Sequence, residues 1–318
     1  MTTLQPKLII QIPCLNEEET LPITLGDLPQ NISGISKIER LVIDDGSTDR
    51  TVEVARANHV EHILSLGRRC GLAKAFMSGI TRSLELGADI IVNTDADNQY
   101  VGADIAKLAE PILKGEADVV IGARPIAEIS HFSPLKKILQ KLGSAVLRQI
   151  SQTTVVDAPS GFRAYSREAA LRMNVFSRFT YTMETLIQAG RQGLRVVSVP
   201  IRVNGKLRES RLFKGMGRYI ARSMTTMIRI YVLYAPLRFF LWLGTPLFLA
   251  GMLFMVRWLI FFLEGSERTR IPSLILAAVL ILMGVQLLAL GVIADLIAKN
   301  RMLSEELVYR SRKSALKL

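Results

Sequence analysis

The stretch Ile90-Ile91-Val92-Asn93-Thr94-Asp95-Ala96-Asp97-Asn98-Gln99 joins a short apolar run to a pair of carboxylates. An uninterrupted apolar run of this kind is typical of a strand buried on both faces, as in a parallel sheet covered by helices. Ligands of such sheets bind beyond the carboxyl ends of the strands. Asp95 and Asp97 stand at that end, and Mg²⁺ commonly binds one or two carboxylates together with substrate phosphates. The stretch therefore predicts an α/β fold with a Mg²⁺ or Mn²⁺ site at one edge of its sheet.

The first 200 residues repeat this alternation of short apolar runs and amphipathic stretches. We expect strands at residues 7–14, 40–44, 62–66, 89–93, 118–122, 162–165 and 196–203. We expect helices at residues 17–28, 51–57, 72–86, 103–114, 134–150, 167–173 and 182–192. The alternation predicts a doubly wound, Rossmann-like sheet flanked by helices. With 49% apolar residues and two cysteines, the 318-residue chain is neither disordered nor stapled by disulfides.

Two further polar clusters follow predicted strands near the start of the chain. Pro13-Cys14-Leu15-Asn16-Glu17-Glu18-Glu19 is also what a helix start needs, with Asn16 as its cap and Glu19 completing a capping box. Ile43-Asp44-Asp45-Gly46-Ser47-Thr48-Asp49 could be a simple turn. An aspartate at a strand end can also accept hydrogen bonds from a nucleobase or a ribose. The two clusters thus leave a structural and a nucleotide-binding interpretation open.

Arginines accompany carboxylates in two later clusters. Val156-Asp157-Ala158-Pro159-Ser160-Gly161-Phe162-Arg163 places a carboxylate and a guanidinium around a turn, and Arg208-Glu209-Ser210-Arg211 follows further on. Such pairs are often structural, but arginine also binds phosphate in a planar, bidentate manner. The clusters therefore allow either a structural role or a phosphate-transfer centre.

Two long apolar runs lie near the C-terminus. Residues 239–263 hold 20 apolar residues in 25 with one charge, Arg257, and residues 271–294 hold 19 in 24 with none. A bilayer core requires a helix of about 20 residues, and helices that are apolar on every face are buried or span a membrane. We expect a two-helix transmembrane hairpin at residues 237–297, the alternative being a buried hairpin of a soluble domain. The pattern excludes a plain soluble enzyme and a many-pass transporter.

Lysine and arginine residues flank the two runs, whereas the connecting residues 264–270 hold two basic and two acidic residues. The positive-inside rule then predicts an inner-membrane protein whose catalytic domain and both termini are cytoplasmic. No signal peptide is expected, because the apolar stretch after residues 1–6 is too short. Residues 298–318 are expected to form a basic cytoplasmic tail.

The net charge of +12 is concentrated before the first run, since residues 200–238 hold nine basic residues and one acidic residue. A basic stretch beside a span indicates anionic or phosphorylated lipid as the partner. Nucleic acid is the competing partner, but no nucleic-acid motif is present. Residues 213–236 place Arg218, Arg222 and Arg229 opposite an apolar face. They predict an amphipathic helix in the membrane interface, with a helix packed on the soluble domain as the alternative.

In their combined order, these motifs resemble those of the family 2 glycosyltransferases of GT-A fold, and among them the dolichyl- or polyprenyl-phosphate sugar synthases. The matching motifs are Pro13-x-Leu15-Asn16-Glu17, Asp44-Asp45-Gly46-Ser47, Asp95-Ala96-Asp97-x-Gln99, Gly122-Ala123-Arg124 and Ser160-Gly161-Phe162-Arg163. The resemblance covers about residues 7–215 and implies a catalytic domain over residues 1–212. The two spans that follow are similar to those of bacterial members with a small membrane anchor.

The resemblance implies roles for the matching positions. The nucleotide sugar would be bound by Pro13, Leu15, Glu17, Ile43, Asp45, Asp95 and Ala96. The metal would be held by Asp95, Asp97 and Gln99. The acceptor phosphate would be bound by Arg124, Arg163, Arg208, Ser210 and Arg211. Leu15 replaces a common tyrosine, and residues 205–211 depart from the family's basic loop, so the choice among Lys206, Arg208 and Arg211 for the phosphate contact stays open.

The resulting prediction is a membrane hexosyltransferase that moves a sugar, with inversion, from a UDP- or GDP-linked donor to polyprenyl phosphate. We assign Asp97, Arg124 and Asp157 to catalysis, with Asp157 acting as a base or as an orienting group. One alternative is a processive polysaccharide synthase, but Arg257-Trp258 lacks the glutamine of the Gln-x-x-Arg-Trp motif of those enzymes, since Phe254 stands there. The other is a non-catalytic membrane scaffold. A homo-oligomer is compatible with each of these readings.

Overall fold

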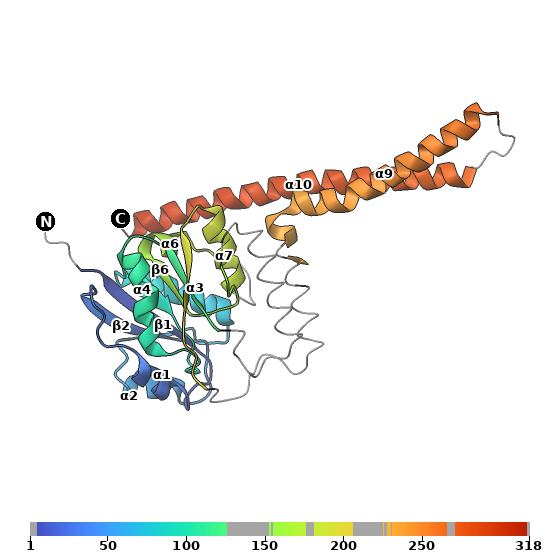
Figure 1. Ribbon diagram of the computed structural model, residues 1–318. Coiled ribbons are helices and arrows are strands. Elements are labelled where there is room, and N and C mark those ends of the chain that lie inside the picture. Colours follow the sequence, from blue (N-terminus) through green and yellow to red (C-terminus); the bar gives the residue numbers. More distant parts are fainter. Residues whose placement is uncertain are drawn as a thin grey trace. The chain divides into compact units, whose positions relative to one another are not determined.

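The computed structural model describes residues 5–125, 153, 155–175, 181–205, 225, 228–229, 231–265 and 271–316. The chain divides into two compact units. The first comprises Met1–Met216 together with Val308–Leu318, and the second comprises Gly217–Leu307. The first unit contains the sheet, and the second contains most of two long apolar helices (Figure 1).

Seven strands form one mixed sheet. They are β1 (Lys7–Cys14), β2 (Lys37–Asp44), β3 (His62–Ser65), β4 (Ile90–Asn93), β5 (Val119–Ala123), β6 (Arg163–Ser166) and β7 (Val196–Pro200), in the spatial order β3-β2-β1-β4-β6-β5-β7. Neighbouring strands are parallel except at β6, which runs antiparallel to both β4 and β5. Each of the seven predicted strands is confirmed, with ends that differ by at most a few residues.

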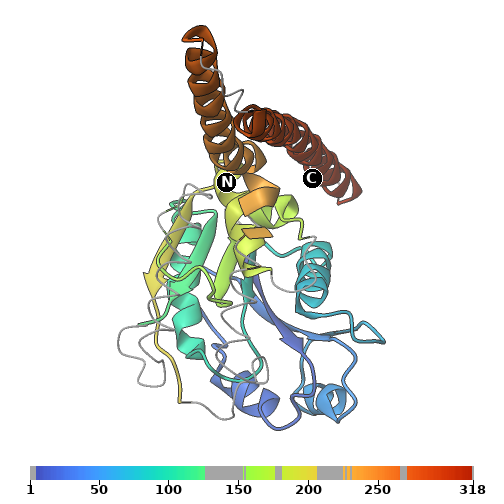
Figure 2. The ribbon, with the colours of Figure 1, turned by 90° about the vertical axis from the view of Figure 1, so that its right-hand side faces the viewer.

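Helices cover both faces of this sheet. They are α1 (Leu21–Asp27), α2 (Thr51–Ala57), α3 (Leu72–Glu85), the 3-10 turn η1 (Gly102–Asp104), α4 (Ile105–Leu113), α6 (Arg167–Arg172) and α7 (Thr182–Arg191). In Figure 2 the cyan helix α3 and the green helix α4 lie on opposite sides of the sheet. Successive side chains of a strand point to opposite faces, so Leu8, Ile10 and Ile12 of β1 join the core with α1 and α4, while Gln11 faces Gly79 of α3. The predicted helix at 134–150 lies outside the described residues.

The first helix starts later than predicted, because the residues before it bind another loop. Asn16 does not cap a helix: α1 begins at Leu21, and Asn16 has a φ of 56°. Its Oδ1 accepts a hydrogen bond from Thr48 N at 2.8 Å, and its own N–H donates to Ser47 Oγ at 3.0 Å. The helix-cap interpretation of this cluster is therefore wrong, and the loops after β1 and β2 are joined instead.

The second unit contains α9 (Pro236–Leu263) and most of α10 (Ile271–Ala315), both long and apolar enough to cross a membrane. Small residues lie at their contact every seven positions, at Gly244 and Gly251 of α9 and at Ala277, Gly284 and Gly291 of α10. A Cβ added to Gly251 would lie 2.8 Å from Ile281 N, and one added to Gly284 would lie 2.8 Å from Phe248 Cα. A seven-residue repeat keeps one seam facing the partner helix, and small residues let the two backbones approach closely.

Helix α10 passes the predicted end of the hairpin at residue 297 without a break. It continues to Ala315, and Val308–Leu318 belong to the first unit. The segment 298–318, expected to be a separate basic tail, is thus helical as far as Ala315. The predicted interfacial helix at 213–236 lies mostly outside the described residues.

Replacing Gly251 by leucine should separate α9 from α10, because the added side chain would meet the main chain of α10. Overpacking of this kind costs about 1–3 kcal/mol. We expect a lower melting temperature of the detergent-solubilised protein. Thr245→Leu makes a similar small-to-large change at an exposed position of α9 and should leave the melting temperature nearly unchanged. Equal effects of the two substitutions would show that the glycine seam is not closely packed.

Candidate active site

Several of the described loops meet at one edge of the sheet. The strands β1, β2 and β4 are parallel, so their carboxyl ends share that edge. Arg163, at the start of the antiparallel strand β6, lies opposite both Asn93 of β4 and Ile121 of β5. The end of β5 and the start of β6 therefore lie at the same edge. The strand topology thus brings together Asp95 after β4, Arg124 after β5 and Asp157 before β6.

Asp95 and Asp97 occupy the loop after the central strand β4. Removal of the Asp95 carboxyl from water, with the negative charge of Asp97 beside it, raises the pKa of Asp95 to about 7, although Arg124 opposes the shift. Asp97 Oδ1 accepts a hydrogen bond from the N–H of Gln99 at 3.2 Å, and Asn98 between them has a left-handed φ of 52°. A carboxyl with a raised pKa is stabilised as the anion by a nearby cation, so this loop favours a positively charged ligand.

The two carboxylates fit a divalent cation whose coordination is completed by a substrate. Mg²⁺ and Mn²⁺ prefer oxygen ligands, and Mg²⁺ is commonly held by one or two carboxylates plus phosphate oxygens. Within the described ranges, no group of three or more His, Cys, Asp and Glu side chains could hold a metal on its own. The pair therefore suits a cation shared with a diphosphate rather than one enclosed by the protein.

Arg124 and Asp157 form a two-pronged ion pair. Arg124 Nε donates to Asp157 Oδ2 at 2.7 Å, and Nη2 donates to Oδ1 at 3.0 Å. The side chains are 10% and 0% exposed. Because both carboxylate oxygens accept from Arg124, the geometry favours an orienting role for Asp157 over a role as base. Arg124 also acts electrostatically on Asp95, so Asp157 holds a guanidinium close to the carboxylate pair.

The structure corrects the assignment of Arg163 to the acceptor phosphate. Its side chain is fully buried. It donates at 2.5 to 2.9 Å to Ser160 O, Ala158 O, Thr182 O and Thr185 Oγ1. Four of the five N–H donors of a guanidinium are thus used inside the protein. Arg163 fixes the loop 157–162 and has no exposed surface with which to meet a phosphate. Of the other predicted acceptor residues, Arg124 is described above, whereas Arg208, Ser210 and Arg211 lie outside the described residues.

The predicted nucleotide-binding residues lie at the ends of β1 and β2, on the joined loops that follow these strands, and in the loop after β4. Pro13 and Leu15 are half-buried. Glu17 is buried, with its N–H donating to Thr51 Oγ1 at 2.8 Å and its Oε2 accepting from Thr20 Oγ1 at 2.7 Å. The side chain of Ile43 is fully buried close to Gly79 of α3 and belongs to the core. Ala96 is buried, and its carbonyl accepts from Thr24 Oγ1 at 3.0 Å.

Asp45 holds a loop that the sequence analysis did not include in the site. Its Oδ1 accepts from Cys70 N at 2.7 Å and its Oδ2 accepts from Gly71 N at 2.9 Å. Gly46 has a φ of 77°, and a Cβ there would lie 2.6 Å from the carbonyl carbon of Arg68. Only glycine therefore allows the loop after β3 to approach the loop after β2.

This loop adds two exposed guanidinium groups, Arg68 and Arg69, close to the loop after β2. The signal in the sequence is Gly67-Arg68-Arg69-Cys70-Gly71, a charged pair between glycines that follows the predicted third strand. Since a parallel strand ends at the same edge as its neighbours, the pair could have been assigned to the site from the order of elements alone.

Gly161 lies against the carboxylate pair. A Cβ there would be 2.9 Å from the Tyr181 hydroxyl and 3.3 Å from each carboxylate oxygen of Asp95. Its carbonyl accepts from Asn93 Nδ2 at 2.9 Å, and its N–H donates to the Tyr100 hydroxyl at 3.2 Å. The loop before β6 therefore touches Asp95 through a residue that has no side chain.

The comparisons with known proteins agree with this site. The family described as glycosyl transferase family 2 matches residues 9–172, which is about half of the chain. The chain therefore belongs to glycosyl transferase family 2. Its membership of this family and its similarity to mannosyltransferases identify it as a hexosyltransferase.

Three relatives illustrate the similarity. The undecaprenyl-phosphate mannosyltransferase of Micrococcus luteus is 30% identical over 216 residues, covering 64% of this chain and 87% of the relative. The polyprenol monophosphomannose synthase of Mycolicibacterium smegmatis is 26% identical, covering 61% and 76%. A UDP-N-acetylglucosamine–dolichyl-phosphate N-acetylglucosaminyltransferase of Methanococcus voltae is 30% identical, covering 60% and 83%.

A solved structure supports the fold. The glucosyl-3-phosphoglycerate synthase of Mycobacterium tuberculosis, in complex with Mn²⁺, UDP and phosphoglyceric acid, superposes with a TM-score of 0.55 at 20% identity. The match covers 71% of this chain and 78% of that chain. The predicted GT-A-like mixed sheet flanked by helices is confirmed.

Substituting Arg163 by methionine should destabilise the first unit. Buried carbonyl groups would lose their donors, and each such loss costs about 1–3 kcal/mol. Thermal unfolding should show a clear decrease in melting temperature. Arg195→Met, which removes an exposed ion pair with Asp118, should change the melting temperature little. A stable Arg163→Met protein with a raised KM for the acceptor would instead restore a phosphate-binding role.

Divalent cations should bind more weakly as the pH falls below about 7. The raised pKa keeps Asp95 protonated below that value in the metal-free protein, so a cation must displace a proton. The apparent Kd for Mn²⁺, measured by isothermal titration calorimetry, should rise by up to about tenfold per pH unit below 7 and change little above it. An apparent Kd that is constant between about pH 6 and pH 8 would contradict the assignment of Asp95 as a ligand.

Proposed function

We propose that this chain transfers a sugar from a nucleotide-diphosphate sugar to the phosphate of a polyprenyl phosphate, at a membrane surface and with Mg²⁺ or Mn²⁺ as cofactor. The observation that carries the proposal is the meeting of the Asp95–Asp97 carboxylates and the Arg124–Asp157 pair at one sheet edge. A cation on the carboxylates could bind the donor diphosphate, and a guanidinium could donate hydrogen bonds to a second phosphate. An enzyme that moves a sugar from one phosphate to another must bind both phosphate groups.

Two observations support a lipid acceptor. The relatives described above are named for undecaprenyl phosphate, a polyprenol monophosphate sugar and dolichyl phosphate. The chain also contains two helices long and apolar enough to cross a membrane, and the basic segment 200–238 lies just before them. Basic residues beside a span attract anionic headgroups at about 1 kcal/mol each. We propose that α9 and α10 cross the cell membrane as a hairpin, with both termini cytoplasmic because lysine and arginine flank its outer ends.

In the proposed reaction, Asp95 and Asp97 would hold the cation that binds the donor diphosphate, with Gln99 as a further candidate ligand. When bound, the cation would neutralise the charge that develops on the departing nucleoside diphosphate. Arg124, oriented by Asp157, binds the acceptor phosphate. A phosphate monoester has a second pKa of about 6, so it is largely ionised at neutral pH and needs no general base.

The bond changes are those of a single inverting displacement. An oxygen of the acceptor phosphate attacks the anomeric carbon from the side opposite the diphosphate. The new carbon–oxygen bond forms as the bond to the diphosphate breaks, and the electron pair leaves with the nucleoside diphosphate. The residues of the chain contribute position and charge stabilisation rather than proton transfer.

The joined loops after β1 and β2 are the proposed nucleoside site. The candidate contacts at the ends of these strands and in these loops are Pro13, Leu15, Glu17 and Asp45. Arg68 and Arg69 lie beside them. Leucine at position 15 removes the base stacking that a tyrosine would supply, so the affinity for the base would rest on hydrogen bonds. UDP- and GDP-linked sugars are both candidate donors.

Membranes that contain the full-length chain should transfer label from one UDP- or GDP-linked sugar to added polyprenyl phosphate. EDTA should abolish the transfer, and Mg²⁺ or Mn²⁺ should restore it. Asp97→Asn should lower the rate by at least about 100-fold, since even substitutions behind metal ligands typically cost 10- to 100-fold. Asp118→Asn is the matched control, because that carboxylate pairs with Arg195 at the start of β5. Full activity of Asp97→Asn, or no transfer to any polyprenyl phosphate, would refute the proposal.

A further inference from the structure

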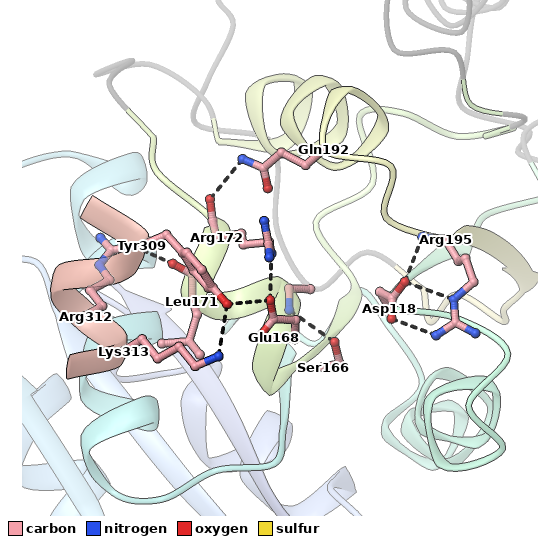
Figure 3. A network of polar contacts seen from close by, with 11 residues as sticks. Asp118, Ser166, Glu168, Leu171, Arg172, Gln192, Arg195, Tyr309, Arg312 and Lys313 are labelled. Carbon is pink, nitrogen blue, oxygen red and sulfur yellow. Dashed lines mark hydrogen bonds and ion pairs between the residues drawn. The ribbon is translucent and has the colours of Figure 1, made fainter. Parts of the chain in front are cut away.

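The last turns of α10 bind the helix that follows β6. Figure 3 shows Tyr309, Arg312 and Lys313 of α10 beside Glu168, Leu171 and Arg172 of α6. All these residues belong to the first unit. We call this contact, together with the carbonyl of Met173, the tail dock. It was not foreseen from the sequence, where residues 298–318 read only as a basic tail.

Tyr309 occupies the centre of the tail dock. It is 9% exposed, although it stands on a helix end that is otherwise largely exposed. Its hydroxyl donates to Glu168 Oε1 at 2.9 Å. The guanidinium of Arg172 lies 4.2 Å from the centre of its ring and donates to the same Glu168 oxygen at 2.7 Å. One aromatic side chain thus makes a hydrogen bond and a cation–π contact with a single ion pair.

Arg312 completes the dock by binding main-chain oxygens. Its Nη1 donates to Met173 O at 2.6 Å and to Leu171 O at 3.3 Å. These carbonyls lie at the C-terminal end of α6, where the last carbonyls of a helix lack partners within the helix. A basic side chain there satisfies them and interacts favourably with the helix dipole. The dock is therefore specific for the end of α6 and is not a general attraction between charged surfaces.

Helix α6, to which the tail dock binds, follows directly after strand β6, which holds part of the candidate active site in place. The cap of α6, Ser166, is also the last residue of β6. The first residue of β6 is Arg163, which binds the carbonyls of the loop containing Asp157 and Gly161. β6 also pairs with β4 at Asn93, two residues before Asp95. The last turns of α10 therefore bind the element that also holds the loop with Asp157 and Gly161.

The same helix carries the second apolar run. Residues 295–315 continue α10 for about 30 Å beyond that run at 1.5 Å per residue. A catalytic unit that is joined to a helix by flexible chain connections can rotate on it, whereas the tail dock adds fixed side-chain contacts to the end of α10. A soluble substrate can reach a rotating site from any side, but a lipid acceptor is confined to the membrane surface. Orientation therefore matters for the lipid substrate in particular.

We propose that Tyr309 and Arg312 are positioning residues, which fasten α6 to the end of the membrane helix α10 and so hold the catalytic unit in an orientation that a membrane-borne acceptor can use. The inference rests on the proposed polyprenyl-phosphate acceptor. It adds that the C-terminal turns of α10 influence the use of the lipid acceptor without touching it.

The test uses the full-length protein in phospholipid vesicles and two acceptors, a long-chain polyprenyl phosphate and a short, water-soluble prenyl phosphate. Tyr309→Ala combined with Arg312→Ala should lower kcat with the long-chain acceptor by about tenfold. Mn²⁺-dependent binding of the nucleotide sugar and transfer to the soluble acceptor should change by less than about twofold. Tyr309→Phe keeps the ring on Arg172 and loses only the hydroxyl, so it should show a smaller loss.

Two controls make changes of similar size outside the dock. Leu307→Ala removes an exposed side chain of α10, and Lys299→Ala removes a basic side chain that pairs with Asp295 of the same helix. Both should behave as the unsubstituted protein. Hydrogen exchange supplies a readout that is independent of activity. The amides of residues 308–315 and of α6 should exchange faster in the double variant and at the normal rate in the controls.

Three results would overturn the inference. The dock could open, as judged by hydrogen exchange, while transfer to the long-chain lipid stays normal. Donor binding and both transfer reactions could fall together, which would make the dock only a stabiliser of the fold. The unsubstituted protein could transfer sugar to the soluble acceptor but never to the lipid, in which case the proposed acceptor fails as well. Failure of the proposed acceptor is distinguishable from failure of the positioning role, because it is observed with the unsubstituted protein.

Discussion

The carboxyl of Asp95 is held partly out of water beside a second carboxylate, and the rest of the site is arranged around that constraint. Burial and the charge of Asp97 raise its pKa to about 7, so positive charge close by favours the anion. Arg124 supplies one such charge and is fixed in place by Asp157. A divalent cation shared with a diphosphate would supply the other. The site therefore suits a donor that brings a divalent cation with its diphosphate.

The antiparallel strand β6 connects this site to the scaffold. Because it reverses direction between β4 and β5, the loop that precedes it ends at the same edge as the loops that follow its neighbours. A buried guanidinium is costly unless its donors are satisfied, and Arg163 meets that requirement with oxygens of two segments. The loop with Asp157 and Gly161 is held against Asp95 as a consequence, and Gly161 makes the contact without a side chain.

The two long apolar helices pack through contacts that repeat along their length. Glycines at intervals of seven let α9 and α10 pack closely. Helix α10 then continues into the first unit, where Tyr309 and Arg312 bind α6. One half of α10 is thus apolar enough to cross a membrane, and its last turns bind the scaffold that carries the site. In the proposed function, this continuity joins a substrate confined to two dimensions to a site that faces water.

The sequence by itself determined the seven strands, the two apolar helices and the acidic strand ends, because apolar runs and polar strand ends are local patterns with a local physical cause. It could not assign Arg163, since Arg124 and Arg163 both stand at strand ends in similar motifs. Only the pairing of β6 with β4 and β5 buries one of them and leaves the other beside the carboxylates. Asn16, Asp45 and Tyr309 likewise received their partners from segments distant in the chain. The partner of a polar side chain depends on which segments the sheet and helices bring together, and that is decided by tertiary packing.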